Sequence, residues 1–107
     1  MPVKAFNAYL EKRSGLSSPS LLALEFARVD NTHPARTTTE ERASPEGGGP
    51  TAVTVTLDGL ADDSVRAVRY VLHFDPAGVG WRLRSATWAQ RCQAGRGHED
   101  FGASDCV

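Results

Sequence analysis

The sequence has little excess charge of either sign, no long apolar run and almost no cysteine. Lysine and arginine total 12 against 13 acidic residues, and the formal net charge is −1. Such a balance does not favour a nucleic-acid binder or a polybasic membrane anchor. The chain also lacks the roughly 18 consecutive apolar residues that a membrane-spanning helix needs. We therefore predict a single globular domain over residues 1–107.

Enzyme signatures are missing as well. There is no Walker loop, dinucleotide fingerprint, HExxH motif or GxSxG elbow, and we predict neither a cofactor nor a bound metal. The opening text MPVKAFNAYLEKRSG has neither the charged-then-apolar order nor the cleavage site of a signal peptide. Taken literally, this predicts a cytoplasmic protein. An export signal or anchor removed from upstream of Met1 would instead predict an extracytoplasmic one.

The N-terminal residues show helical periodicity. Val3, Phe6 and Leu10 recur at three- and four-residue steps, with a proline near the first turn and a glycine just past the end. We predict an amphipathic helix over residues 1–15.

The segment LLALEFARVD, residues 21–30, fits two structures. Leu22, Leu24 and Phe26 alternate as in a half-buried strand, which is our prediction. A serine directly before Pro19 would equally cap a second helix, so the helix stays open as an alternative.

Residues 31–50 are poor in apolar side chains. Two alanines are the only apolar residues in NTHPARTTTEERASPEGGGP. We predict an exposed, linker-like loop, although its length is unusual for a compact domain. Part of it, Thr37 to Ala43, could extend an edge strand.

Residues 51–92 contain three runs in which apolar and polar side chains alternate. The segments DGLADDS and DPAGVG between the runs are rich in turn-forming residues. This pattern predicts a three-stranded antiparallel meander with one buried face. Trp88 falls out of phase with Trp81, which indicates a β-bulge near Ser85–Ala86 or coverage of both sheet faces there.

The two cysteines lie on either side of a glycine-rich tail, residues 93–107. Cys92 directly follows the last predicted strand, and thirteen residues separate it from Cys106. We predict a disulfide that closes this tail onto the sheet and indicates an oxidising compartment. Free thiols in a cytosolic protein remain an alternative. A zinc site is a weaker one, because Cys92, His98 and Cys106 supply three ligands at spacings unlike standard zinc motifs.

Together these elements predict an α+β fold. One N-terminal helix would pack on a curved antiparallel sheet of about four strands, followed by the disulfide-closed loop. Basic residues from two adjacent strands would project from the solvent side of the sheet. They could bind an acidic partner, a phosphate or a headgroup, or simply form an ordinary polar face. These candidate residues are Arg69, His73, Arg82 and Arg84.

The predicted function is a non-catalytic, extracytoplasmic interaction or accessory domain with a protein partner. One alternative is a small-molecule-binding or enzymatic domain that uses His73 or His98 in a cavity between helix and sheet. A second is a homodimerisation module with Val71 and Trp88 at the seam.

The text DGLADDSVRAVRYVLHF, followed by GVGWRLRSATWAQRCQAGRGHEDFGASDCV, resembles the C-terminal half of small exported or membrane-tethered actinobacterial proteins. Such proteins end in a similar pattern of Arg-Cys, Gly-Arg-Gly-His, Asp-Phe and Cys. The resemblance covers about half the chain. It implies a tether upstream and a cystatin-like or nuclear-transport-factor-2-like sheet, and it implies no catalytic residue.

Overall fold

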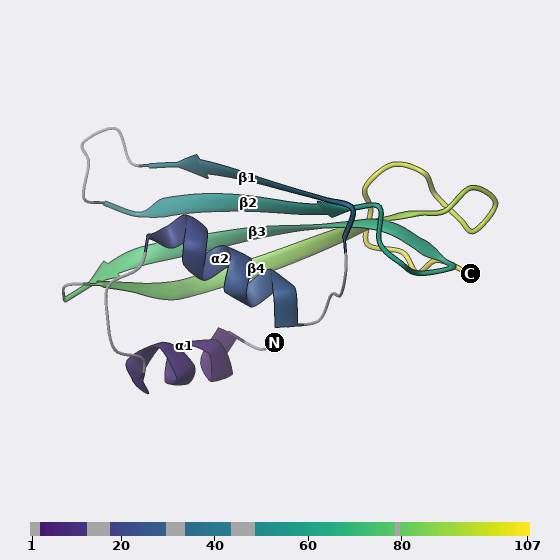
Figure 1. Cartoon of the computed structure of the whole chain (residues 1–107). Helices are drawn as coiled ribbons and strands as arrows, with labels where there is room; N and C mark the ends of the chain where they lie inside the picture. The colour runs from purple at the N-terminus through teal and green to yellow at the C-terminus, as the bar shows by residue number, and fades with distance from the viewer. Residues whose placement is uncertain (1–2, 13–17, 30–33, 44–48, 79) are drawn as a thin grey trace.

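The computed structural model describes residues 3–12, 18–29, 34–43, 49–78 and 80–107. Within them, two helices precede four strands (Figure 1). The strands form one antiparallel sheet in the order β1-β2-β3-β4, so each strand pairs with its sequence neighbour. The elements are α1 (Val3–Lys12), α2 (Pro19–Val29), β1 (Arg36–Arg42), β2 (Thr51–Asp58), β3 (Val65–Ala77) and β4 (Gly80–Cys92).

Both helices lie on the same side of the sheet, which we call the helix face; the opposite side is the open face (Figure 1). Helix α2 contacts β1, β2 and β3, whereas α1 contacts β4. The predicted α+β fold with a curved sheet and the predicted meander are therefore confirmed. The helix predicted over residues 1–15 occupies Val3–Lys12, and the remaining positions of that prediction lie outside the described residues.

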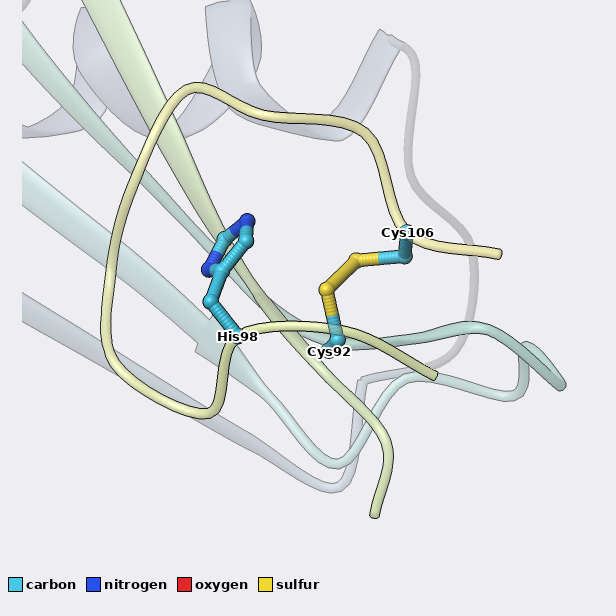
Figure 2. Close-up of side chains that lie close together, drawn as sticks. All are labelled: Cys92, His98 and Cys106. Atoms are coloured by element: carbon cyan, nitrogen blue, oxygen red, sulfur yellow. A yellow bond between two sulfur atoms is a disulfide. The ribbon is translucent and has the colours of Figure 1, made fainter. Parts of the chain in front are cut away.

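After β4 the chain folds back along the edge of that strand. Gln90 and Gly102 exchange two backbone hydrogen bonds, of 2.8 and 3.0 Å. A disulfide joins Cys92 at the end of β4 to Cys106 in the tail (Figure 2). The predicted staple is thus confirmed, and it fixes the tail beside the sheet.

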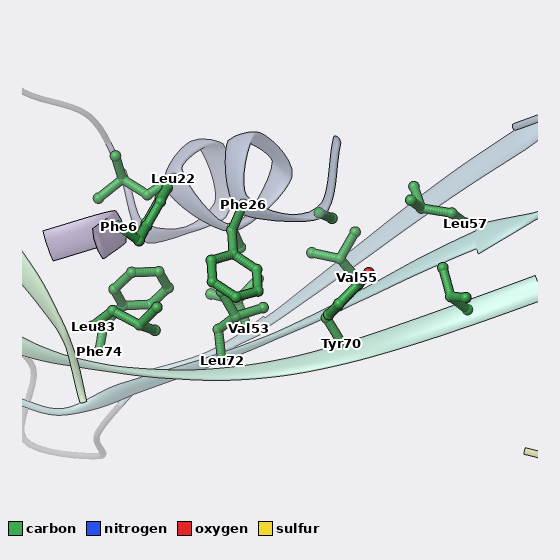
Figure 3. Packing of buried hydrophobic residues seen from close by; sticks show 13 residues of the cluster. Phe6, Leu22, Phe26, Val53, Val55, Leu57, Tyr70, Leu72, Phe74 and Leu83 are labelled. Atoms are coloured by element: carbon green, nitrogen blue, oxygen red, sulfur yellow. The ribbon is translucent and has the colours of Figure 1, made fainter. Parts of the chain in front are cut away.

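The core lies between the helices and the helix face (Figure 3). Three aromatic rings connect the two layers. Phe6 meets Phe26 edge to face at 5.2 Å between centroids, and Phe26 meets Tyr70 in the same way at 5.8 Å. Such edge-to-face pairs add to the stabilisation that comes from buried apolar area. The sheet supplies Val53, Val55, Leu57, Leu72, Phe74 and Leu83, each at most 1% exposed.

The strand predicted for residues 21–30 is wrong, because residues 21–29 belong to helix α2; residue 30 lies outside the described residues. Leu22 and Phe26, one helical turn apart, both point into the core and are at most 5% exposed. Leu24 lies between them and is only half-buried. Apolar residues at every second position include pairs that are four residues apart. The same sequence therefore fits the two-residue period of a strand and the 3.6-residue period of a helix.

The start of α2 explains why the helix prevails. The Ser18 hydroxyl accepts a hydrogen bond from the Leu21 N–H at 3.3 Å, and the Ser18 carbonyl accepts one from the Leu22 N–H at 3.1 Å. This is the geometry of a helix N-cap, with Pro19 at the first helical position where its missing N–H costs nothing. The capping alternative was therefore the correct one.

The predicted loop over residues 31–50 is also wrong in part, since it contains strand β1; the alternative of an edge strand over Thr37 to Ala43 agrees with β1 to within one residue. Residues 36–42 pair with β2 from Arg36 opposite Asp58 to Arg42 opposite Ala52. All seven β1 residues are at least partly exposed, so this strand is held by backbone pairing and needs no apolar pattern. Residues 31–33 and 44–48 lie outside the described residues.

A bulge in β4 changes which side chains face the core. Phe74 pairs with Leu83 but His73 pairs with Ser85, so Arg84 is an extra residue in β4. This is the bulge predicted near Ser85–Ala86, one residue earlier in the chain. It returns Trp88 to the helix face, opposite the buried Tyr70, where Trp88 remains 49% exposed.

The free edge of β4 is closed by one side chain of α1. The Leu83 N–H donates to Asn7 Oδ1 at 2.8 Å, and Asn7 Nδ2 donates to the Leu83 carbonyl at 2.8 Å. The amide of Asn7 thus replaces the peptide group of a further strand. Asn7 is only 8% exposed, so water has little access to these groups.

We expect Asn7→Ala to destabilise the protein by about 2–4 kcal/mol, because it leaves a buried donor and a buried acceptor of Leu83 unpaired. Urea unfolding followed by tryptophan fluorescence measures this loss. Ala8→Ser, at the exposed neighbouring position of α1, serves as the matched control and should change little. Equal stability of the two variants would show that the amide does not hold α1 to the sheet.

Candidate functional site

The open face brings the predicted basic residues onto one side of β3 and β4. Arg69, His73 and Asp75 pair with Ala89, Ser85 and Arg82, so these side chains share the face opposite the core. The bulge residue Arg84 reaches the same side, where its Nε lies 3.7 Å from Asp75 Oδ1.

Arg69 has a structural partner on this face. Its guanidinium carbon lies 4.0 Å from the centroid of the Phe101 ring, and its Nε donates to Thr56 Oγ1 at 3.1 Å. Arg91 approaches the same ring at 5.6 Å. The two arginines thus hold the tail against the open face through cation–π contacts. Arg69 is for this reason less accessible to a partner than the other predicted basic residues.

A cleft of about 720 Å³ lies where α1 meets the hairpin of β3 and β4. Lys4, Arg82 and Arg84 bring three cationic side chains to it, against the one carboxylate of Asp75. Its apolar part comes from Val3, Ala8 and Leu83, and Asn7 completes the lining. Two of the four predicted patch residues, Arg82 and Arg84, therefore belong to this cleft.

The ion pair in the cleft is exposed and replaceable. The side chains of Arg84 and Asp75 are 56% and 39% exposed, and pairs of this kind contribute little net stability. An incoming anion can take the place of Asp75 beside Arg84 while gaining attraction from Lys4 and Arg82. The cleft therefore suits a ligand in which an acidic group lies next to an apolar group.

Sequence reasoning missed Lys4 and Asn7 as parts of this site. They sit on α1, whereas Arg82 and Leu83 lie more than seventy positions later. No local pattern reports such a long-range contact. The polar side of the predicted amphipathic helix was the only sequence feature to suggest that α1 has a role besides packing against the core.

Other predicted candidates are not brought together. Val71 pairs with Thr87 on the open face, whereas Trp88 lies opposite Tyr70 on the helix face, so the two proposed seam residues are on opposite sides of the sheet. His73 shares the open face with Asp75, but neither His73 nor His98 lines the cleft.

His98 lies in a second constellation, inside the closed tail. Its Nδ1 is 2.7 Å from the Asp100 carbonyl oxygen, and its Nε2 is 2.8 Å from the Ser104 carbonyl oxygen. Carbonyl oxygens only accept, so both ring nitrogens can donate only when the imidazole is doubly protonated. The hydrogen bonds to Ser104 and Asp100 accordingly raise the pKa of His98 above its ordinary value of 6.5.

The same loop places His98 beside the disulfide. The two sulfur atoms and a ring nitrogen of His98 all lie within 4.8 Å of one another (Figure 2). Cys92 is 1% exposed, and Cys106 is half-buried. A buried intramolecular disulfide is more typical of extracytoplasmic proteins than of cytosolic ones.

No protein-family model matches the chain, and searches of curated proteins and of solved structures find no match either. The resemblance to exported actinobacterial proteins therefore stays a prediction. Neither described helix is long and apolar enough to cross a membrane.

We expect the double substitution Cys92→Ser with Cys106→Ser to lower the free energy of unfolding by about 3 kcal/mol, the value expected for a loop of this length. Urea unfolding of wild type and variant measures the difference. Intact mass after alkylation, with and without reductant, checks the bond itself. Alkylation of both thiols in the unreduced protein would contradict the disulfide.

We expect the stability of the oxidised protein to fall as pH rises through the pKa of His98. A raised folded-state pKa means that this contribution is complete below the ordinary value of 6.5 and disappears above the raised one. NMR titration of the ring and urea unfolding across this window test it. The contribution should be absent in His98→Gln, and a ring pKa at or below 6.5 would contradict the double hydrogen bond.

Proposed function

We propose that this protein is a non-catalytic, extracytoplasmic interaction domain that binds an acidic segment of a protein partner in the cleft beside α1. The observation that carries the proposal is the excess of cationic over anionic side chains around this cleft, together with its apolar part. Carboxylates of a partner would pair with Arg82 and Arg84, whose planar guanidinium groups favour two-point contacts.

The chemistry of the lining supports binding more than catalysis. Among the described residues, the cleft contains no histidine, cysteine or hydroxyl side chain. The amide of Asn7 is occupied by the backbone of Leu83, and the carboxylate of Asp75 lies beside Arg84. The lining thus offers no hydroxyl or thiol nucleophile with a histidine base beside it.

The extracytoplasmic location is supported by the disulfide. Oxidising compartments preserve such bonds, whereas cytosolic thiol systems reduce them. A signal peptide or membrane anchor encoded upstream of Met1 would agree with this location. Intact mass of the protein from its native host, with free thiols alkylated during lysis, tests it directly.

We expect an acetylated Glu-Leu-Glu-Glu-Leu-Glu peptide to shift NMR signals of α1 and of the hairpin between β3 and β4. The paired substitutions Arg82→Gln and Arg84→Gln should weaken this binding at least about tenfold, because both charge-assisted contacts disappear. The affinity should also fall with added salt. Titration of the labelled, oxidised protein gives the dissociation constants.

Arg36→Gln is the matched control for this experiment, since it removes one exposed cation from the far edge of the sheet. A Gln-Leu-Gln-Gln-Leu-Gln peptide tests the need for charge. Equal binding of the two peptides, or unchanged binding after the Arg82 and Arg84 substitutions, would remove the proposed function. Saturable binding of inorganic phosphate alone would replace the acidic peptide with a small anion.

A further inference from the structure

The disulfide and His98 form a compact set of metal-binding atoms. Sγ of Cys92 at the end of β4, a ring nitrogen of His98 in the middle of the loop and Sγ of Cys106 near the C-terminus lie within 4.8 Å of one another. We propose that reduction of the disulfide converts this cluster into a Zn²⁺ site with two thiolates and one imidazole as protein ligands. The proposal does not depend on the function of the cleft.

The loop has contacts that keep these ligands together without the sulfur–sulfur bond. The Cys92 N–H donates to the His98 carbonyl at 2.9 Å, and a backbone bridge joins β4 to the tail. The residue after Cys106 donates its N–H to the Arg96 carbonyl at 2.7 Å. A reduced protein that retains these bonds presents a largely formed site, which lowers the entropic cost of binding a metal.

The surroundings of His98 match those of a metal-bound histidine. Such a ligand typically donates its second ring N–H to a carbonyl or carboxylate, which fixes the orientation of the ring. His98 has a backbone carbonyl at each nitrogen, from Asp100 and from Ser104. The nitrogen that binds the metal gives up its carbonyl hydrogen bond, and the other nitrogen keeps its carbonyl partner.

Gly97 leaves the space that the sulfur of Cys92 requires. A Cβ atom at this position would lie 2.9 Å from the Cys92 Sγ, closer than such atoms approach in practice, and the residue has a φ of +136°. Glycine thus allows the loop to pass directly beside the ligand sulfur.

A small-molecule dithiol can supply the two electrons that reduce the disulfide of Cys92 and Cys106. Thiol–disulfide exchange transfers two electrons to the pair, which yields two cysteine thiols and the oxidised, cyclic disulfide of the dithiol. Binding of Zn²⁺ then releases both thiol protons, and the metal-bound ring nitrogen of His98 carries no proton. Two thiolates and a neutral imidazole leave the site with no net charge, and a water molecule takes the fourth tetrahedral position.

Metal and disulfide exclude each other in this arrangement. Each Zn–S bond is about 2.3 Å long in tetrahedral geometry, so two sulfurs bound to one zinc ion are too far apart to stay bonded to each other. Zinc is favoured over harder cations because two thiolates with one imidazole suit a borderline-soft, tetrahedral metal. Bound zinc would also retain the thiols in their reduced form.

Native mass spectrometry and chelator competition test the site. We expect one Zn²⁺ per chain after reduction with a phosphine, at a mass that shows loss of two protons, and none in the oxidised protein. Co²⁺ should give the near-ultraviolet charge-transfer bands of thiolate ligation. Absence of zinc in the reduced, folded protein would overturn the proposal.

Variants separate a built site from loose thiol binding. Cys106→Ser and His98→Gln should each weaken zinc binding at least about 100-fold. This is more than the loss expected when only a hydrogen-bond partner of a metal ligand is removed. His73→Gln is the matched control and should bind as the wild type does. Unchanged affinity in His98→Gln, or equal affinity of the wild-type chain in concentrated urea, would show that His98 and the folded loop do not form the site.

Discussion

The exposed edge of β4 is the constraint on which the rest of this structure depends. A strand at the edge of a sheet presents N–H and C=O groups that need partners or protection. Three separate devices supply partners here: the amide of Asn7 at Leu83, the backbone of Gly102 at Gln90, and the carbonyl of His98 at the N–H of Cys92. The first brings α1 to the hairpin and so creates the cleft, while the other two fold the tail around the sulfur atoms.

The distribution of charge matters more here than its sum. A net charge of −1 excludes little about local surfaces, because the basic and acidic residues are not evenly mixed. Cations prevail on the open face of β3 and β4, whereas the tail carries Glu99, Asp100 and Asp105. A nearly neutral chain can therefore still offer a basic cleft to an acidic partner.

The meander was predictable because alternating β-branched and aromatic residues report one buried face, and the staple was predictable because a strand end and a glycine-rich tail each hold one thiol. Strand β1 was foreseen only as an alternative, an edge strand over Thr37 to Ala43, because backbone pairing without apolar side chains holds it to β2. Helix α2 was mistaken because Leu22, Leu24 and Phe26 fit both periods. Two of the three cations of the cleft, Arg82 and Arg84, were foreseeable, but their proximity to α1 depends on the contact between Asn7 and Leu83.

The exposed edge of strand β1 affects the tendency of the protein to aggregate. Its outer edge is a template on which a second molecule could add a strand, the first step toward fibrous aggregates. Four of the seven side chains of β1 are charged, and charged side chains on an edge strand oppose such pairing. The hydrophilic text RTTTEER, which left this strand as only an alternative in the sequence analysis, thus also discourages a second copy from adding a strand.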